Sequence, residues 1–230
     1  MKNLLLMTGF FLWTQLALAQ EFPSPSDFEI EGSTKQVQNV TLTTAIIDLD
    51  QNGIDDALTL QLSSGAEVVD EAPCAGCGHR FEGKFVVLVQ MNGAKTSRTQ
   101  LNQFFQRSEL SFWAKPWSIS FADYNHDGIL DFNLGQFENS NNWEYRLFTV
   151  TSGGKVKSLS IPDGAIYVCD DSNSTSRIFQ TQAGFWYKAF SNGEEAGWHQ
   201  FFLNWNTRHK QFELVQHRHS MDEPESPASY

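Results

Sequence analysis

Hydrophobic and polar residues alternate along most of this chain of 230 residues, and the pattern predicts β-strands. The alternation is strict over residues 58–62 and 117–121, where every second residue is hydrophobic, and partial over residues 40–47. A period of two places the hydrophobic residues on one face, so each strand is expected to bury one side. The chain is therefore predicted to be all-β.

These strands form a unit that occurs twice. Each unit reads strand, acidic loop, strand, connection, strand, turn and strand, with turns at Asn92-Gly93 and Gly153-Gly154. Both are common hairpin turns, and four strands per unit are typical of a propeller blade. The acidic loops begin at residues 48 and 123, which is a wide spacing for blades. Insertions are therefore expected at residues 63–83 and 96–110, the second with a short amphipathic helix.

The C-terminal part continues the rhythm without an acidic loop. Residues 185–190, 198–205 and 212–215 are predicted to be three further strands. Residues 220–230 contain two prolines and three acidic residues, and this tail is predicted to be disordered. The expected fold is a single domain over residues 20–219, a small and irregular β-propeller-like domain of antiparallel four-stranded units.

Two loops of like composition carry the candidate chemistry. Counted from its first Asp, each has an oxygen-bearing side chain at positions 1, 3, 5 and 9, Gly at position 6 and Ile at position 7. Calcium takes six to eight oxygen ligands, and a tight loop supplies them from alternate side chains and one backbone carbonyl. Neither loop is an EF-hand, because position 12 is Thr59 or Leu134 instead of Glu and strands flank both loops.

The loop pattern Asp-x-Asp/Asn-x-Asp/Asn-Gly-x-x-Asp between strands resembles the FG-GAP or VCBS repeat of extracellular β-propellers. The likeness covers residues 40–62 and 117–137, without the Phe-Gly and Gly-Ala-Pro signatures of that family. It implies two Ca²⁺ sites, each at the edge of a blade. The implied ligands are the side chains of Asp48, Asp50, Asn52 and Asp56 with the carbonyl of Ile54, and those of Asp123, Asn125, Asp127 and Asp131 with the carbonyl of Ile129.

A narrower likeness concerns residues 121–132. This segment resembles that of a group of exported bacterial propeller proteins, some of which inhibit lysozyme-like effectors and serve as immunity proteins. The resemblance implies a periplasmic inhibitor whose protein partner is a basic cell-wall hydrolase.

The first 19 residues have the form of a secretory signal peptide. Lys2 precedes an apolar stretch over residues 4–18, and Ala17-Leu18-Ala19 is a small-x-small cleavage site. No later stretch is long and apolar enough to span a membrane, so a soluble periplasmic or extracellular protein is expected. The mature chain carries 15 basic and 27 acidic residues, a net charge of −12. This charge argues against nucleic acid and favours a basic protein partner.

The three cysteines permit at most one disulfide bond. A structural disulfide is expected in an oxidising compartment, either Cys74 with Cys77 or one of them with Cys169. A redox pair at Cys74 and Cys77 and a zinc site are the alternatives. His209, His217 and His219 are expected to be surface residues at a strand end, with a transition-metal site as the alternative.

No catalytic residues are predicted, because the chain has no Gly-x-Ser-x-Gly, His-Glu-x-x-His or phosphate-binding glycine motif. The expected function is non-catalytic binding of another macromolecule. A secreted hydrolase on a propeller scaffold is the competing hypothesis, because acidic pairs for glycoside hydrolysis meet in space and not in sequence.

Overall fold

The computed structural model describes residues 32–72, 76–169, 174–175 and 178–224. The chain divides into two units, Met1–Ile30 and Glu31–Tyr230, and the first lies outside the described residues. The predicted signal peptide, residues 1–19, and the end of the predicted tail, residues 225–230, lie outside them as well. The fold described below is that of the second unit.

Three antiparallel sheets follow one another along the chain. Sheet A has the strand order β1-β2-β3-β4, and β5 also pairs with β3. Its strands are β1 (Ser33–Ile47), β2 (Asp56–Val69), β3 (Arg80–Gln90), β4 (Ser97–Gln100) and β5 (Leu110–Trp113). The expected short helix is present as α1 (Asn102–Phe105), between β4 and β5.

Sheets B and C continue the pattern. Sheet B has the order β10-β8-β7-β6, with β9 paired to β8, and sheet C has the order β11-β12-β13-β14. Sheet B contains β6 (Phe121–Ala122), β7 (Asp131–Phe137), β8 (Trp143–Val150), β9 (Val156–Ser158) and β10 (Ile166–Val168), with the 3₁₀ turn η2 (Pro162–Gly164) before β10. Sheet C contains β11 (Phe179–Thr181), β12 (Gly184–Ser191), β13 (Gly197–Asn206) and β14 (Gln211–Ser220).

The all-β prediction and the antiparallel pairing are confirmed. The described part of the chain shows no closed barrel or propeller. No helix among the described residues is long and apolar enough to cross a membrane.

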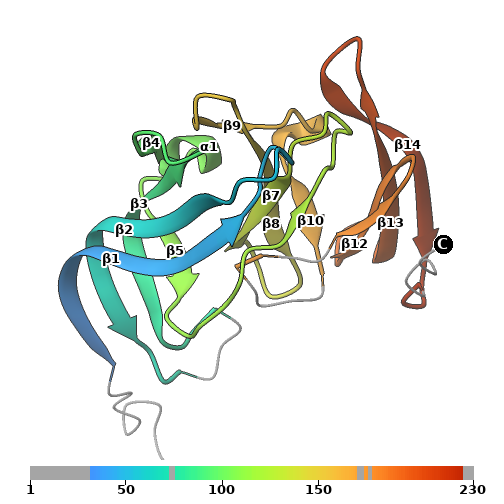
Figure 1. Cartoon of the computed structure of the whole chain (residues 1–230). Helices are drawn as coiled ribbons and strands as arrows, with labels where there is room; N and C mark the ends of the chain where they lie inside the picture. The colour runs from blue at the N-terminus through green and yellow to red at the C-terminus, as the bar shows by residue number, and fades with distance from the viewer. Residues whose placement is uncertain (1–31, 73–75, 170–173, 176–177, 225–230) are drawn as a thin grey trace, which may run out of the picture. The chain divides into compact units, whose positions relative to one another are not determined.

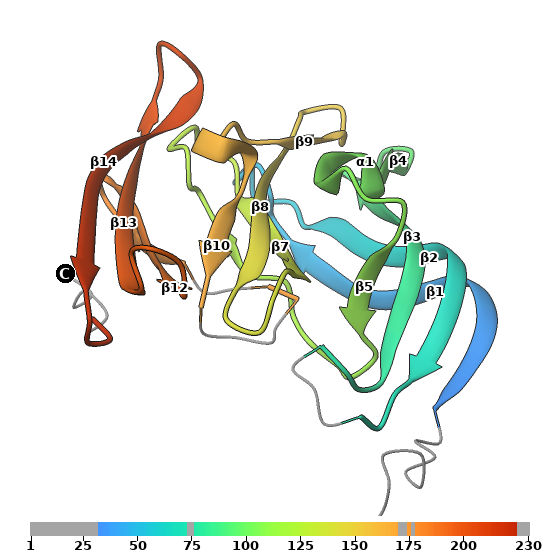
Figure 2. The ribbon, with the colours of Figure 1, turned by 180° about the vertical axis from the view of Figure 1, so that it is seen from behind.

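Sheet B lies between sheets A and C, and each of its faces is covered (Figures 1 and 2). In the first core, Leu60 and Phe85 of sheet A are buried together with Phe132 and Phe148 of sheet B. In the second core, the buried residues are Tyr145 and Ile166 of sheet B and Phe185, Leu203 and Phe212 of sheet C. Burial of each such side chain stabilises the fold by about 1.5–3 kcal/mol, so the two cores hold the sheets together.

The strand predicted over residues 117–121 is largely wrong. Only Phe121 and Ala122 form β6, while Ile119 is buried without being part of a strand. The preceding Pro116 has no N–H for a ladder. Hydrogen bonds to side chains of other segments hold these residues instead. The Thr43 hydroxyl donates to the Trp117 carbonyl (3.0 Å), and the Ser120 N–H donates to the Thr175 hydroxyl (3.2 Å).

Three other features differ from the sequence prediction: the extent of one insertion, the number of strands in sheet C and the start of the tail. Most of the expected insertion at residues 63–83 is strand, because β2 continues to Val69 and β3 begins at Arg80, past a bulge between Leu62 and Ser64. Sheet C has a fourth strand, β11, which the sequence pattern did not reveal. Ser220, expected in the disordered tail, is the last residue of β14.

Candidate metal centres

The first acidic loop, residues 48–56, joins β1 to β2 and is closed by its own carboxylates. The carboxylate of Asp48 accepts hydrogen bonds from the backbone N–H groups of Asn52 (2.9 Å) and Gly53 (2.6 Å). The carboxylate of Asp56 accepts from the N–H of Leu49 (3.0 Å). The carboxylate at position 1 thus binds the N–H groups of positions 5 and 6, and the carboxylate at position 9 binds the N–H group of position 2.

The second acidic loop, residues 123–131, joins β6 to β7 and repeats these bonds at the same positions. The carboxylate of Asp123 accepts from the N–H groups of Asp127 (3.0 Å) and Gly128 (2.9 Å). The carboxylate of Asp131 accepts from the N–H of Tyr124 (3.0 Å). The two loops therefore share a three-dimensional framework as well as a sequence pattern.

The backbone of the two loops also matches. Position 4 has a positive φ in both, 55° at Gln51 and 58° at His126, and so does position 6, 89° at Gly53 and 85° at Gly128. Glycine is required at position 6 for its conformation and not for space, because an added Cβ would have no neighbour within 4 Å in either loop.

Each loop is anchored by burial at positions 2 and 9. Leu49 and Tyr124 lie in the two cores, and Asp56 and Asp131 are no more than 1% exposed. A buried carboxylate is costly unless its oxygens are hydrogen-bonded or bind a cation. One oxygen in each loop, Oδ1 of Asp50 and Oδ1 of Asp131, is buried and has no hydrogen-bond partner. These atoms belong to predicted ligands at positions 3 and 9.

The carboxylates of the first loop are placed as a hard divalent cation requires. In the first loop, carboxylate oxygens of Asp48, Asp50 and Asp56 lie within 4.8 Å of one another, and they are the only such group of three His, Cys, Asp or Glu side chains in the described ranges. The second loop also has three carboxylates, but its position 3 is Asn125, whose amide donates to Asp127 (3.0 Å). All of these donors are oxygens, as calcium prefers.

Electrostatics set Asp131 apart. Burial raises the pKa of this carboxyl group to about 7, and the nearby Asp127 carboxylate raises it further, while the neighbouring Thr149 hydroxyl and hydrogen bonds from the backbone N–H groups of Asn125 and Tyr124 oppose the rise. A bound divalent cation reverses this effect, because it stabilises the ionised form of a carboxylate beside it. A cation in this loop would therefore offset the cost of ionising Asp131.

Asn92, in the turn between β3 and β4, braces the first loop. Its N–H donates to Oδ1 of Asp56 (2.7 Å), and its side-chain oxygen accepts from the Asn52 amide (2.7 Å). The Asn92 amide also lies 3.5 Å from Asp50. Sequence analysis identified this residue only as part of a hairpin turn, because no local spacing connects it to a loop 40 residues away.

The two loops touch each other. The N–H of Leu130, at position 8 of the second loop, donates to the carbonyl of Leu49, at position 2 of the first (2.7 Å). On the other side of the second loop, the side chain of Gln180 in β11 donates to the carbonyl of Asp123. The second loop therefore connects the first loop to sheet C.

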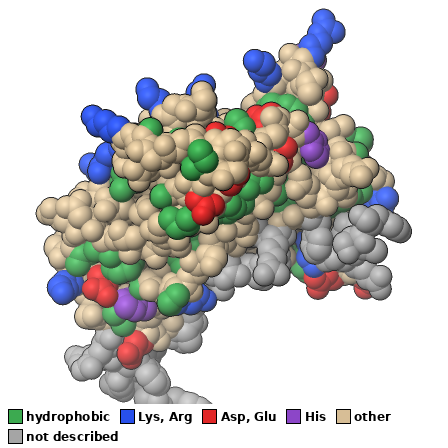
Figure 3. Space-filling model, viewed as in Figure 1, with side chains coloured by type: hydrophobic (Ala, Val, Ile, Leu, Met, Phe, Trp, Pro, Cys, Tyr) green, Lys and Arg blue, Asp and Glu red, His purple; other side chains and the backbone are tan. Residues whose placement is uncertain are grey.

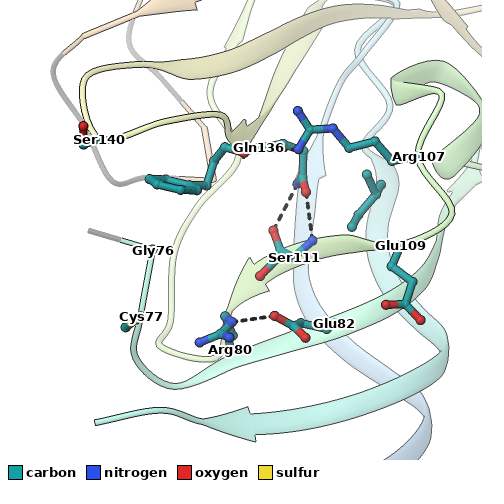
Figure 4. Close-up of a pocket in the computed structure, with 11 residues that line it drawn as sticks. Gly76, Cys77, Arg80, Glu82, Arg107, Glu109, Ser111, Gln136 and Ser140 are labelled. Carbon is teal, nitrogen blue, oxygen red and sulfur yellow. Dashed lines mark hydrogen bonds and ion pairs between the residues drawn. The ribbon is translucent and has the colours of Figure 1, made fainter. Parts of the chain in front are cut away.

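A cavity of about 580 Å³ lies between β3 and β5 of sheet A and β7 of sheet B (Figure 4). On one wall, the Gln136 side chain bonds the backbone of Ser111 twice, accepting from its N–H (2.8 Å) and donating to its carbonyl (3.0 Å). On the other, Arg80 pairs with Glu82 (2.6 Å). Glu109 and Arg107 complete the charged lining, which suits a polar group or side chain of a partner.

The remaining candidate residues lie elsewhere. Cys77 is disulfide-bonded and lines this cavity, while Cys74 lies outside the described residues. His217 and His219 pack against His199 of β13, with 2.9 Å between Nε2 of His217 and Nδ1 of His199. His209 lies instead beside Glu213 (3.0 Å). All three predicted histidines are exposed, and His217 and His219 lie near the end of β14, so the prediction of surface residues is confirmed.

On the face seen in Figure 3, acidic and hydrophobic side chains lie close together, and most Lys and Arg side chains project from the margins. Ile46 and Ile54, in and beside the first acidic loop, are 65% and 55% exposed. The loop thus presents both negative charge and hydrophobic surface.

Comparison with known proteins adds no relative: no family model, curated protein or solved structure matches this chain.

Proposed function

We propose that this protein is an exported, calcium-stabilised β-protein that binds another protein without catalysing a reaction. The observation that carries the calcium site is the repeated loop framework, with one buried carboxylate oxygen in each loop that has no hydrogen-bond partner. The ligands are those expected from the sequence: four side chains and the position-7 carbonyl of each loop. Three successive antiparallel units with four or more strands support a propeller-like arrangement of irregular blades.

In this proposal calcium has a structural role. When bound, the ion supplies positive charge among three carboxylates that otherwise repel one another. Each loop begins and ends in a strand, so holding the loop closed also holds the strand pair in register. Binding free energy then adds to folding free energy. We expect Kd values of roughly 10⁻⁴–10⁻³ M, as in extracellular calcium modules.

Calcium should raise the melting temperature. With a Kd of about 1 mM, 10 mM Ca²⁺ contributes about 1.4 kcal/mol per site, and two sites raise Tm by roughly 5–10 °C. Asp48→Ala and Asp123→Ala should each remove at least half of this rise, as measured by calorimetry. Asp55→Ala is the matched control, because Asp55 is exposed, adjacent and not a predicted ligand. Equal melting temperatures in calcium and in EDTA would contradict the metal assignment.

The proposed partner is a basic cell-wall hydrolase, and the net charge of −12 of the mature chain is the supporting observation. We expect the protein to block wall digestion by a lysozyme-type enzyme at a near-stoichiometric ratio. The block should weaken with added salt, because charge attraction between the proteins is screened. Undiminished digestion at a tenfold excess would reject this partner. Release of sugars from the wall by the protein alone would favour the hydrolase alternative.

A further inference from the structure

The hydrogen bond between the two acidic loops joins residues that adjoin predicted ligands. The carbonyl of Leu49 accepts from the N–H of Leu130 (2.7 Å). Leu49 lies between Asp48 and Asp50, and its own N–H is held by Asp56 (3.0 Å). Leu130 directly precedes Asp131. A cation that fixes the first loop therefore fixes the acceptor of a bond that positions the second loop.

The two loops differ in how far they are organised by the protein alone. In the first, Oδ1 of Asp56 accepts from the N–H of Asn92 (2.7 Å), and the Asn52 amide donates to the side chain of Asn92 (2.7 Å). In the second, Oδ1 of Asp131 is buried and has no hydrogen-bond partner, although the residue is 0% exposed. Oδ1 of Asp50 leaves the first loop with a similar unpartnered oxygen. The loops differ in that Asn92 holds predicted ligands of the first loop, at positions 5 and 9, whereas Leu49 and Gln180 contact only the backbone of the second loop.

We propose that the two loops form one coupled calcium unit, in which binding at the first loop strengthens binding at the second. The proposal rests on the calcium function proposed above. Its physical basis is conformational entropy. The second loop loses conformational freedom when it binds calcium, and part of that loss has already occurred once Leu49 is fixed. Coupling is reciprocal, so the second site strengthens the first by the same factor. We expect a factor of at least about 5, the lower end of the usual range.

Calcium titration of the full chain by NMR can follow the two loops separately. The amide protons of Gly53 and Gly128 donate to Asp48 and Asp123, so their resonances report on the first and second loops. The midpoint of each titration is the calcium concentration at which the shift of the glycine resonance is half complete. In Asp48→Ala, which removes a ligand of the first loop only, the Gly128 midpoint should move to calcium concentrations at least about fivefold higher. Asn92→Ala retains every predicted ligand and should move the Gly128 midpoint in the same direction.

Asp55→Ala is the control for long-range charge, because it removes one exposed carboxylate from the same loop. This variant should leave the Gly128 midpoint within a factor of two of its value in the unmodified protein. An equal shift in Asp55→Ala and Asp48→Ala would overturn the coupling, as would an unchanged Gly128 midpoint in Asp48→Ala and Asn92→Ala. If neither glycine resonance responds to calcium in the unmodified protein, the proposed calcium function itself fails. The two failures are therefore distinguishable.

Discussion

Replacement of Glu144 by alanine is expected to lower the free energy of unfolding by about 3–5 kcal/mol. The side chain of Glu144 is only 6% exposed, and it accepts from Arg107 (2.7 Å) through one oxygen and from Arg146 (2.7 Å) through the other. Removal of the carboxylate leaves both guanidinium groups in a partly buried site without their shared acceptor. Loss of one member of such a network costs more than the network contributes as a whole.

Urea unfolding at fixed calcium concentration measures this loss. The matched control is Glu138→Ala, which removes another carboxylate bound to Arg107 but one that is 38% exposed. Exposed ion pairs contribute about 0–1 kcal/mol, so this control should change stability little. Similar losses of unfolding free energy in the two variants would show that the burial of Glu144 does not determine its contribution to stability.

The Glu144 network also reaches the cavity, because Arg107 belongs to both. Arg107 lies between α1 and β5 and donates to the carbonyl of Phe137 at the end of β7 (3.1 Å), so it ties the two walls of the cavity together. Arg146 packs over the ring of Phe105, at 5.7 Å from its centroid. Arg146 lies two residues from Glu144 on β8, but Arg107 and Phe105 are far in sequence from the residues of sheet B that they contact, and no periodicity connects them.

The strands and the acidic loops were predictable because their signals are local. Alternation over five or six residues identified most strands, although residues 117–121 alternate and are largely not strand, and both loops are complete within nine residues. Contacts between distant segments left no such signal. The brace from Asn92 depends on the pairing of β2 with β3 within sheet A. The bond between Leu49 and Leu130 depends on how sheets A and B pack, and a core assembled from many strands sets that packing.

The failure at residues 63–83 has a more specific cause. The insertion was inferred from the wide spacing of the two acidic loops, which does not show whether the extra residues form a loop or lengthen the strands. Gly65 and Gly83 lie within this segment, and glycine is uncommon in strand interiors. In the structure these two glycines face each other across β2 and β3, just beyond the bulge at Leu62 and Ser64. Glycine within a strand also marks a close approach of two backbones. The two glycines are therefore compatible with paired strands, and the extra residues lengthen β2 and β3.

Replacement of Gly83 by alanine is therefore expected to destabilise the protein by about 3–5 kcal/mol, because two costs combine. The residue has a φ of +146°, which side chains other than glycine rarely adopt, and an added Cβ would lie 2.3 Å from the Ser64 carbonyl oxygen and 2.7 Å from the Gly65 Cα. Both neighbours are backbone atoms, so no rotamer change relieves the clash. The strands must separate, and the hairpin beyond the bulge should lose its pairing.

Urea unfolding and native-state amide exchange together test this expectation. Exchange should accelerate most for residues 64–69 and 80–84, which pair beyond the bulge, and least for the buried strand residues near Leu60 and Val87. Gly153→Ala is the control, because its added Cβ would meet nothing closer than 4.0 Å in an exposed turn, and its stability should change by no more than about 0.5 kcal/mol. If Gly83→Ala unfolds like this control, the two backbones do not need a glycine, and residues 63–83 would be as tolerant of substitution as the loop that the sequence predicted.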